Sequence, residues 1–238
     1  PRIDDLLERL HGAKLFSAMD LQKGFHQIEL DEESRAKTAF AVPWGLYEYT
    51  VMPFGICNGP SVFQRMITLA LGDRLGVDCL GYIDDLLAYS EDEDEMLAKL
   101  DRIFVKLRQA GLKVKPEKCF FGVQRVEFLG HEVSAAGIAP MDSKLDKIAA
   151  APRPRDRRAL RAFLGYINYY RDYIRDFALL ASPLYELLRK EVSWRWADAH
   201  DAAFASVKTA FRSAPILAHP SSAEHELFIL DTDASHDG

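Results

Sequence analysis

The amino-acid sequence predicts an α+β fold, and three observations predict it. Up to about residue 136, short runs of alternating apolar and polar residues, typical of strands, lie among stretches with the period of helices. From Ile138 onward the pattern is mostly helical. The 238 residues are 48% hydrophobic and 28% charged, a composition typical of a globular protein with a sizeable core. Strands mixed with helices, followed by a helical region, indicate the α+β class.

Local signals place the elements along the chain. A helix should begin at Asn58-Gly59-Pro60, because proline suits the first turn of a helix. Ser90 and Glu93 have the spacing of a capping box, so another helix should begin there and end at Gly111. The other expected elements are a helix at 3–10, a strand at 13–21, a hairpin of 38–43 with 47–52 joined by Trp44-Gly45, strands on both sides of 84–85, a strand pair within 126–134, helices at 142–150, 156–180, 183–190 and 198–213, and a closing strand at 226–233.

Composition narrows the function classes. No apolar run approaches the roughly 18 residues of a membrane span, so no membrane partner is expected. Cysteines 57, 79 and 119 are few and widely spaced, which favours a reducing compartment without disulfides or a zinc cluster. The net charge of −6 argues mildly against a nucleic-acid partner, but Lys and Arg gather in segments 102–118 and 144–161. Two interpretations of these segments stay open: a track for a polyanion, or ordinary solvated helix faces.

The segment CLGYIDDLLAYS, Cys79 to Ser90, places two adjacent carboxylates inside an otherwise apolar run. Buried charge is unfavourable unless it is paired or bound to a metal ion, and a plain turn would favour Gly or Asn over Asp84 and Asp85. Asp20 ends the predicted strand at 13–21. A lone Asp in such a place is more often a turn residue or a cap. If the two strands are neighbours, however, the carboxylates face one cleft, and oxygen ligands of this kind favour Mg²⁺.

Nine motifs follow one another along nearly the whole chain. They are LFSAMDLQKGFHQI, KTAF, MPFGICNGPSVFQRM, YIDDLLAYS, GLKVKPEKCFF, VEFLGHEVS, RALRAFLGYINYYRDYI, SPLYELL and LFILDTDAS. In this order they resemble the reverse transcriptase of a gypsy-type long-terminal-repeat retrotransposon. The resemblance implies a polymerase palm with an antiparallel sheet and packed helices, followed by a helical thumb-like region. The expected domains are partial fingers and palm at 1–136, a thumb-like region at 137–192, and at 193–238 a connection with the truncated start of a ribonuclease H-like domain.

The resemblance implies that Asp20, Asp84 and Asp85 are catalytic and metal-binding residues. Asp20 and Asp84 match the two main ligands of two Mg²⁺ ions, which Mn²⁺ could replace, and Asp85 is the adjacent, lesser ligand. The ions would activate the primer 3′-hydroxyl and stabilise the leaving pyrophosphate.

Five further positions match the nucleotide site of the family. Phe25 matches an aromatic residue beneath the sugar that rejects a 2′-hydroxyl, although a core aromatic is the alternative. Phe54 stands where many retroviral relatives have Gln, so a polar contact to the incoming nucleotide would be absent; Phe54 would pack or stack there, and a core aromatic is an equal alternative. Lys118 fits a lysine near the leaving phosphate, and a plain solvated lysine is as good an interpretation. The full expected set is Leu21, Gly24, Phe25, Phe54 and Lys118.

Two later segments match binding elements. Phe128, Leu129, Gly130 and His131 match the hairpin that grips the primer end, and His131 is expected either to touch phosphate or to be a lone exposed histidine. In the thumb-like region, Arg153 to Arg161 would hold the duplex backbone. The tyrosines at 166–173 are expected in the core, with base stacking as the alternative. Asp233 matches the first metal ligand of a ribonuclease H domain, whose other ligands would lie beyond Gly238.

The expected function is therefore that of an RNA-directed and DNA-directed DNA polymerase from a retrotransposon polyprotein. Its partners would be an RNA or DNA template with its primer, and dNTPs; the oligomeric state is not set by the sequence. The family's fingers begin upstream of Pro1, so we expect a fragment of a longer protein. The resemblance also implies an intracellular location, in a cytoplasmic virus-like particle of the parent element. The alternative is a catalytically incomplete nucleic-acid-binding remnant that retains the fold. A metal-dependent phosphohydrolase would explain the carboxylates but not the grip and thumb motifs.

Overall fold

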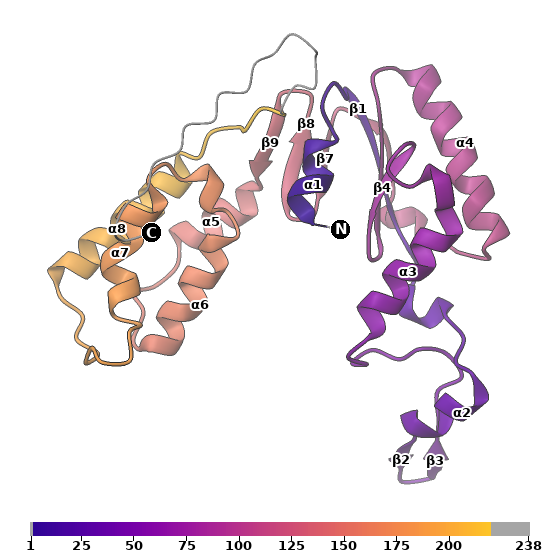
Figure 1. Ribbon diagram of the computed structural model, residues 1–238, viewed down its shortest axis with the longest axis horizontal. Coiled ribbons are helices and arrows are strands. Elements are labelled where there is room, and N and C mark those ends of the chain that lie inside the picture. Colours follow the sequence, from indigo (N-terminus) through magenta and orange to yellow (C-terminus); the bar gives the residue numbers. More distant parts are fainter. Residues whose placement is uncertain (1, 220–238) are drawn as a thin grey trace.

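The computed structural model describes residues 2–219, and its centre is a four-stranded antiparallel sheet in the order β4–β5–β1–β6 (Figure 1). The strands of the chain are β1 (Leu15–Asp20), β2 (Phe40–Val42), β3 (Gly45–Tyr47), β4 (Cys79–Tyr82), β5 (Asp85–Ser90), β6 (Phe120–Val123), β7 (Arg125–Phe128), β8 (His131–Ser134) and β9 (Gly137–Pro140). The helices are α1 (Ile3–Glu8), α2 (Glu32–Arg35), α3 (Gly59–Leu71), α4 (Glu93–Gln109), α5 (Asp142–Ala149), α6 (Arg157–Asn168), α7 (Phe177–Glu186) and α8 (Asp198–Arg212). The predicted α+β class is confirmed.

Both faces of the central sheet are covered, because successive side chains of a strand point to opposite faces. On one face, Met19 and Leu86 pack with side chains of α3 and α4. On the other face, Phe16 and Leu87 pack with side chains of α1, β7 and β8. Figure 1 shows α3 and α4 on one side of the sheet and α1 with the β7–β8–β9 meander on the other.

The helices α5 to α8 form a second body with its own core. Leu160, Leu164, Val207 and Phe211 are among its buried side chains. The predicted helix at 156–180 is wrong as a single element: α6 ends at Asn168, and α7 begins only at Phe177. Between them lies a tight turn over 171–173, and Asp176 has a left-handed φ of 55°. The predicted start of a helix at 183 is also wrong, because Pro183 lies inside α7.

The meander β7–β8–β9 links the two bodies. Its third strand, β9, was not predicted, because Gly137 to Pro140 is too short to show a period. Residue Ile138 of β9 exchanges two backbone hydrogen bonds of 2.9 Å with Leu217, which follows α8. The expected domain boundaries after residues 136 and 192 stay predictions.

Two smaller expectations need correction. The β2–β3 turn is made by Pro43 and Trp44, one residue earlier than predicted, because Val42 pairs with Gly45. The capping box at Ser90 is wrong: the side chain of Asp92 accepts the capping hydrogen bond from the Glu95 amide at 2.8 Å. None of the helices described between residues 2 and 219 is both long and apolar enough to cross a membrane. The closing strand predicted at 226–233 and the predicted metal ligand Asp233 lie outside the described residues.

Candidate active site

The register of the central sheet brings the three predicted carboxylates to one end of it. β1 and β5 are antiparallel, and their last pair is Asp20 opposite Asp85. Residues paired in this way project from the same face, so both side chains point to the side of the sheet that α1 and the β7–β8 hairpin cover. Ile83 and Asp84 form the two-residue turn between β4 and β5, so Asp84 comes directly before Asp85, the first residue of β5. Sequence motifs more than sixty positions apart therefore meet at one edge.

The turn that carries Asp84 is strained and held by a neighbouring helix. Ile83 has a left-handed φ of 55°, which is unfavourable for a β-branched residue. Its amide donates a 2.8 Å hydrogen bond to the side-chain oxygen of Gln64 on α3, and the Leu21 amide donates to the carbonyl of Asp84 at 3.2 Å. These contacts secure the turn from two sides. Sequence reasoning missed Gln64; the only signal was the absence of Gly or Asn from the turn.

Lys118 pairs directly with Asp20. Its ammonium lies 2.9 Å from the Asp20 carboxylate, and the hydrogen bond and charge of that carboxylate raise the pKa of Lys118. Lys118 ends a short 3-10 turn that begins at Pro116, and the amide of Lys115 donates to the Asp20 carbonyl at 2.8 Å. The segment between α4 and β6 thus places the positive charge of Lys118 beside the carboxylates.

Negative charge at this edge is not fully balanced. The pKa of Asp85 is raised to about 6, first by partial loss of hydration and then by the charges of Asp84, Asp20 and Glu127, with Lys118 acting in the opposite direction. Within residues 2–219, no three His, Cys, Asp or Glu side chains are gathered closely enough to hold a metal ion as they stand. Neighbouring carboxylates whose negative charges repel one another are nonetheless a set of oxygen donors that fits a hard divalent cation, because the cation would neutralise that repulsion.

A cavity of about 290 Å³ opens beside these carboxylates. It is lined by the residues that sequence reasoning assigned to the nucleotide site together with two of the carboxylates, namely Asp20, Leu21, Gly24, Phe25, Phe54, Asp84 and Lys118. Phe25 is half-buried, with its ring centre 5.4 Å from that of the exposed Phe54 and 5.7 Å from that of Phe63. A Cβ at Gly24 would lie 3.0 Å from the Phe63 ring, so a larger residue would crowd this wall. The predicted set is therefore brought together in space.

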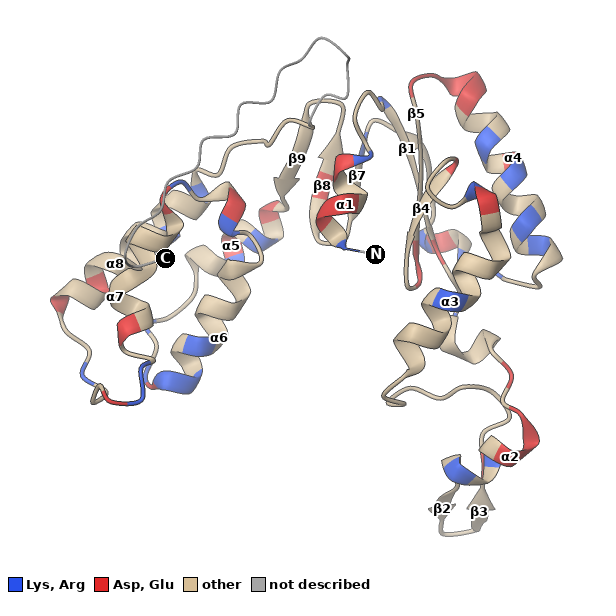
Figure 2. Cartoon of the chain, viewed as in Figure 1, with Lys and Arg blue, Asp and Glu red and all other residues tan. Residues whose placement is uncertain are grey.

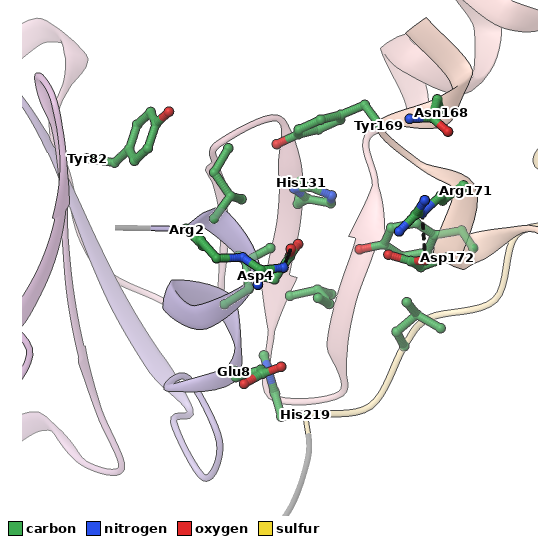
Figure 3. A pocket seen from close by; sticks show the side chains of 15 residues that line it. Arg2, Asp4, Glu8, Tyr82, His131, Asn168, Tyr169, Arg171, Asp172 and His219 are labelled. Atoms are coloured by element: carbon green, nitrogen blue, oxygen red, sulfur yellow. Dashed lines mark hydrogen bonds and ion pairs between the residues drawn. The ribbon is translucent and has the colours of Figure 1, made fainter. Parts of the chain in front are cut away.

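Of the four predicted grip residues, His131 lines a different cavity. This space of about 620 Å³ lies between α1, the β7–β8 hairpin and the turn after α6. Figure 3 shows His131 and Tyr169 in it, between Tyr82 on one side and Arg171 with Asp172 on the other. The expectation that His131 is exposed is wrong: only 4% of it is accessible, and burial lowers the pKa of its imidazole. Phe128 is also buried, whereas Leu129 and Gly130 form the turn.

Residues 1–133 match the family model described as reverse transcriptase (RNA-dependent DNA polymerase). The chain belongs to the reverse transcriptase family. The match covers more than half of the chain and includes the sheet, the carboxylate edge and the β7–β8 hairpin.

Relatives of this reverse transcriptase domain are retrotransposon polyproteins. The retrovirus-related Pol polyprotein from transposon 412 of Drosophila melanogaster is 41% identical over 99% of the chain, and the transposon Tf2-3 polyprotein of Schizosaccharomyces pombe is 34% identical over 99%. The chain spans about a fifth of the length of these relatives, 19% and 18% respectively.

Solved reverse transcriptases share the fold. A foamy viral protease–reverse transcriptase in complex with double-stranded DNA matches 90% of this chain and 38% of its own, with a TM-score of 0.83 and 27% identity. The same kind of protein in complex with an RNA/DNA hybrid matches 91% of this chain and 30% of its own, with a TM-score of 0.81 and 26% identity.

Proposed function

We propose that this chain is the polymerase segment of a gypsy-type retrotransposon reverse transcriptase, which adds dNTPs to a primer 3′-hydroxyl on an RNA or DNA template. The observation that carries the proposal is the pairing of Asp20 with Asp85 at the edge where Asp84 forms the adjoining turn. Membership of the reverse transcriptase family supports it.

Asp20 and Asp84 would hold two divalent cations, Mg²⁺ or Mn²⁺, and Asp85 would add negative charge beside them. When bound, such ions lower the pKa of the attacking hydroxyl and neutralise charge on the leaving pyrophosphate. Lys118 would release Asp20 as the cations arrive, because one carboxylate oxygen cannot serve both partners equally well. Its ammonium would then lie beside the phosphates, where it can donate a proton or a hydrogen bond.

The walls of the 290 Å³ cavity would set the choice of nucleotide. Phe25 packs against the rings of both Phe54 and Phe63, so its own ring has little freedom to retreat. A 2′-hydroxyl placed against that ring would meet a rigid apolar surface, which disfavours ribonucleotides. Gly24, without a side chain, would let the backbone approach the substrate.

Binding of the template–primer would rest on the helical body and the β7–β8 hairpin. Figure 2 shows Lys and Arg on α4 and at the start of α6, at opposite ends of the view, so the two basic segments form no single track. On α4, Lys99 and Arg102 are occupied by Glu95 and Asp78. At the start of α6, Arg157 donates to the backbone carbonyls of Leu187 and Val192. The exposed Arg158 and Arg161 are therefore the better candidates for phosphate contacts.

Primer extension on a homopolymer template tests the proposal. The wild-type protein that carries this chain should synthesise DNA only with Mg²⁺ or Mn²⁺, and Asp84→Asn should abolish synthesis. Asp101→Asn, an exposed carboxylate on α4, is the matched control and should retain the wild-type rate. Template binding without synthesis by the wild type would instead support the catalytically incomplete remnant, and synthesis that survives Asp84→Asn would refute the proposed site.

A further inference from the structure

The turn of the β7–β8 hairpin has an unusual backbone. Phe128 pairs with His131, so the two turn residues are Leu129 and Gly130. Both have positive φ, 50° and 79°, which is the backbone of a tight hairpin turn that favours Asn-Gly or Gly-Gly. Leucine is unfavourable at the first of these positions. Contacts from outside the hairpin should therefore help to hold the turn.

Two tyrosine hydroxyls supply such contacts. The hydroxyl of Tyr169 donates to the Leu129 carbonyl at 2.7 Å, and that of Tyr170 donates to the Gly130 carbonyl at 3.1 Å. Each bond joins residues forty positions apart. A Cβ at Gly130 would lie 3.2 Å from the Tyr170 hydroxyl, so glycine permits this close approach as well as the backbone conformation.

Tyr170 is anchored in the core of the helical body, and Tyr169, which is 44% exposed, packs against Tyr170. Tyr169 and Tyr170 follow the last residue of α6, and Tyr170 is 3% exposed, with its ring centre 5.4 Å from that of Phe211 on α8. The two tyrosine rings meet edge to face at 4.8 Å. The hydroxyls therefore transmit the position of the helical body to the turn.

His131 completes the contact from the hairpin side. Its ring centre lies 5.4 Å from those of Tyr169 and Tyr170, and 5.7 Å from that of Tyr173, against which it stacks. Its Nδ1 lies 3.1 Å from the Leu129 carbonyl that Tyr169 also contacts. The buried histidine thus contacts the same turn as the two tyrosine hydroxyls, and its packing against three tyrosine rings accounts for its burial.

The turn lies on the side of the sheet that carries Asp20 and Asp85. Tyr82, two residues before Asp84, lines the same cavity as His131 and Tyr169 (Figure 3). Tyr82 also pairs with Asp85 across β4 and β5. A displacement of the turn would therefore change the geometry beside the carboxylates.

We propose that Tyr169 and Tyr170 are positioning residues for the primer terminus, because their hydroxyls place the Leu129–Gly130 turn relative to the carboxylate edge from the helical body. This inference rests on the proposed polymerase function. Small displacements of a reacting group reduce the rate of the chemical step more than they reduce binding.

The experiment compares Tyr169→Phe and Tyr170→Phe with Tyr166→Phe in the protein that carries this chain. Each change removes one hydroxyl and keeps the ring, so the core of the helical body is retained. Tyr166 is the matched control: it lies one turn earlier in α6, and its hydroxyl has no hydrogen-bond partner among the described residues. The measurements are kcat and the KM for dNTP in primer extension, the Kd for an oligonucleotide template–primer, and hydrogen exchange of the 125–134 segment.

The two test variants should each lower kcat about fivefold, the rate equivalent of one hydrogen bond, while Kd and the KM for dNTP change less than twofold. Amide exchange in the hairpin should become faster in both, and Tyr166→Phe should match the wild type in every measurement. Test variants that behave like Tyr166→Phe in an active enzyme overturn this inference alone. A fivefold fall in kcat accompanied by an equal weakening of the Kd for template–primer would also overturn it, because that result indicates a general loss of order in the protein. A wild-type protein without synthesis refutes the proposed function, and the primer role fails with it.

Discussion

The ammonium of Lys118 lies 2.9 Å from a carboxylate oxygen of Asp20, although ninety-eight positions separate the two residues in the sequence. Asp20 ends β1, and Lys118 ends the 3-10 turn that follows α4 and Pro116. The backbone bond from the Lys115 amide to the Asp20 carbonyl fixes the approach of that turn. The Lys118 ammonium thus pairs with a carboxylate, that of Asp20, to which the proposed function assigns a divalent metal ion.

Lys118→Met should strengthen the binding of Mn²⁺ in the absence of nucleic acid, because the metal ion no longer competes with an ammonium for Asp20. The pair is partly exposed, so we expect a modest gain, about threefold in Kd. Isothermal titration of the free protein with Mn²⁺ measures it. Lys115→Met is the control, since Lys115 lines the same cavity and reaches Asp20 through its backbone amide. Equal affinity in the wild type and Lys118→Met would show that the two cations do not compete.

Asp85→Asn should stabilise the protein at pH 7 and have little effect at pH 4. The pKa of Asp85 rises to about 6 on folding from an ordinary value of 3.8, so the folded state binds the proton more tightly. The wild type therefore loses stability as the pH rises from about 4 to 6, and asparagine escapes that loss. The residue as a whole remains exposed, and screening limits the gain to about 1 kcal/mol. Urea denaturation with EDTA at both pH values measures it, and a gain that is the same at pH 4 and pH 7 contradicts the assignment.

Asp78→Asn should lower the free energy of unfolding by about 2 kcal/mol at pH 7, since a buried carboxylate loses its charge-assisted bonds. Asp78 is 1% exposed and accepts two hydrogen bonds from Arg102, at 2.9 and 2.7 Å. These bonds lower the pKa of Asp78, so its contribution is present above an ordinary pKa of 3.8 and disappears as the pH falls through the folded value. Denaturation curves at pH 7 and pH 3 measure the effect. Asp73→Asn is the control, because the Asp73 side chain is exposed in the same segment. Equal melts for the two variants would disprove the role given to Asp78.

Phe25→Ala should relax the discrimination against ribonucleotides by about tenfold or more, because the cavity wall retreats from the position of a 2′-hydroxyl. The quantity to measure is the ratio of kcat/KM for a dNTP to that for the matching rNTP. Phe54→Ala is the comparison: it removes one of the two rings that contact Phe25 but keeps the Phe25 ring and its contact with Phe63, so its loss of discrimination should be smaller than that of Phe25→Ala. Unchanged selectivity in an active Phe25→Ala enzyme would remove Phe25 from the nucleotide site.

Local patterns predicted most elements because each depends on neighbouring residues. The period of α4, the proline at the start of α3 and the alternation in β1 are all local signals, and the structure has each of these elements. The break after α6 could not be predicted in this way, because the apolar residues within 169–176 keep the spacing of a helix face. Tyr170 and Tyr173 instead turn into the core that α6 shares with α8, and that packing outweighs the helical preference.

The chain's own sequence determined the order of its motifs, the α+β class and the presence of acidic residues at the ends of two strands. Those features follow from side-chain type and spacing over a few positions. Only the tertiary structure decided that Asp20 faces Asp85, that Lys118 pairs with Asp20, and that His131 is buried under three tyrosines. Each of these contacts joins segments that are distant along the chain. Strand register and the packing of whole elements set such distances, and neither leaves a mark on local periodicity.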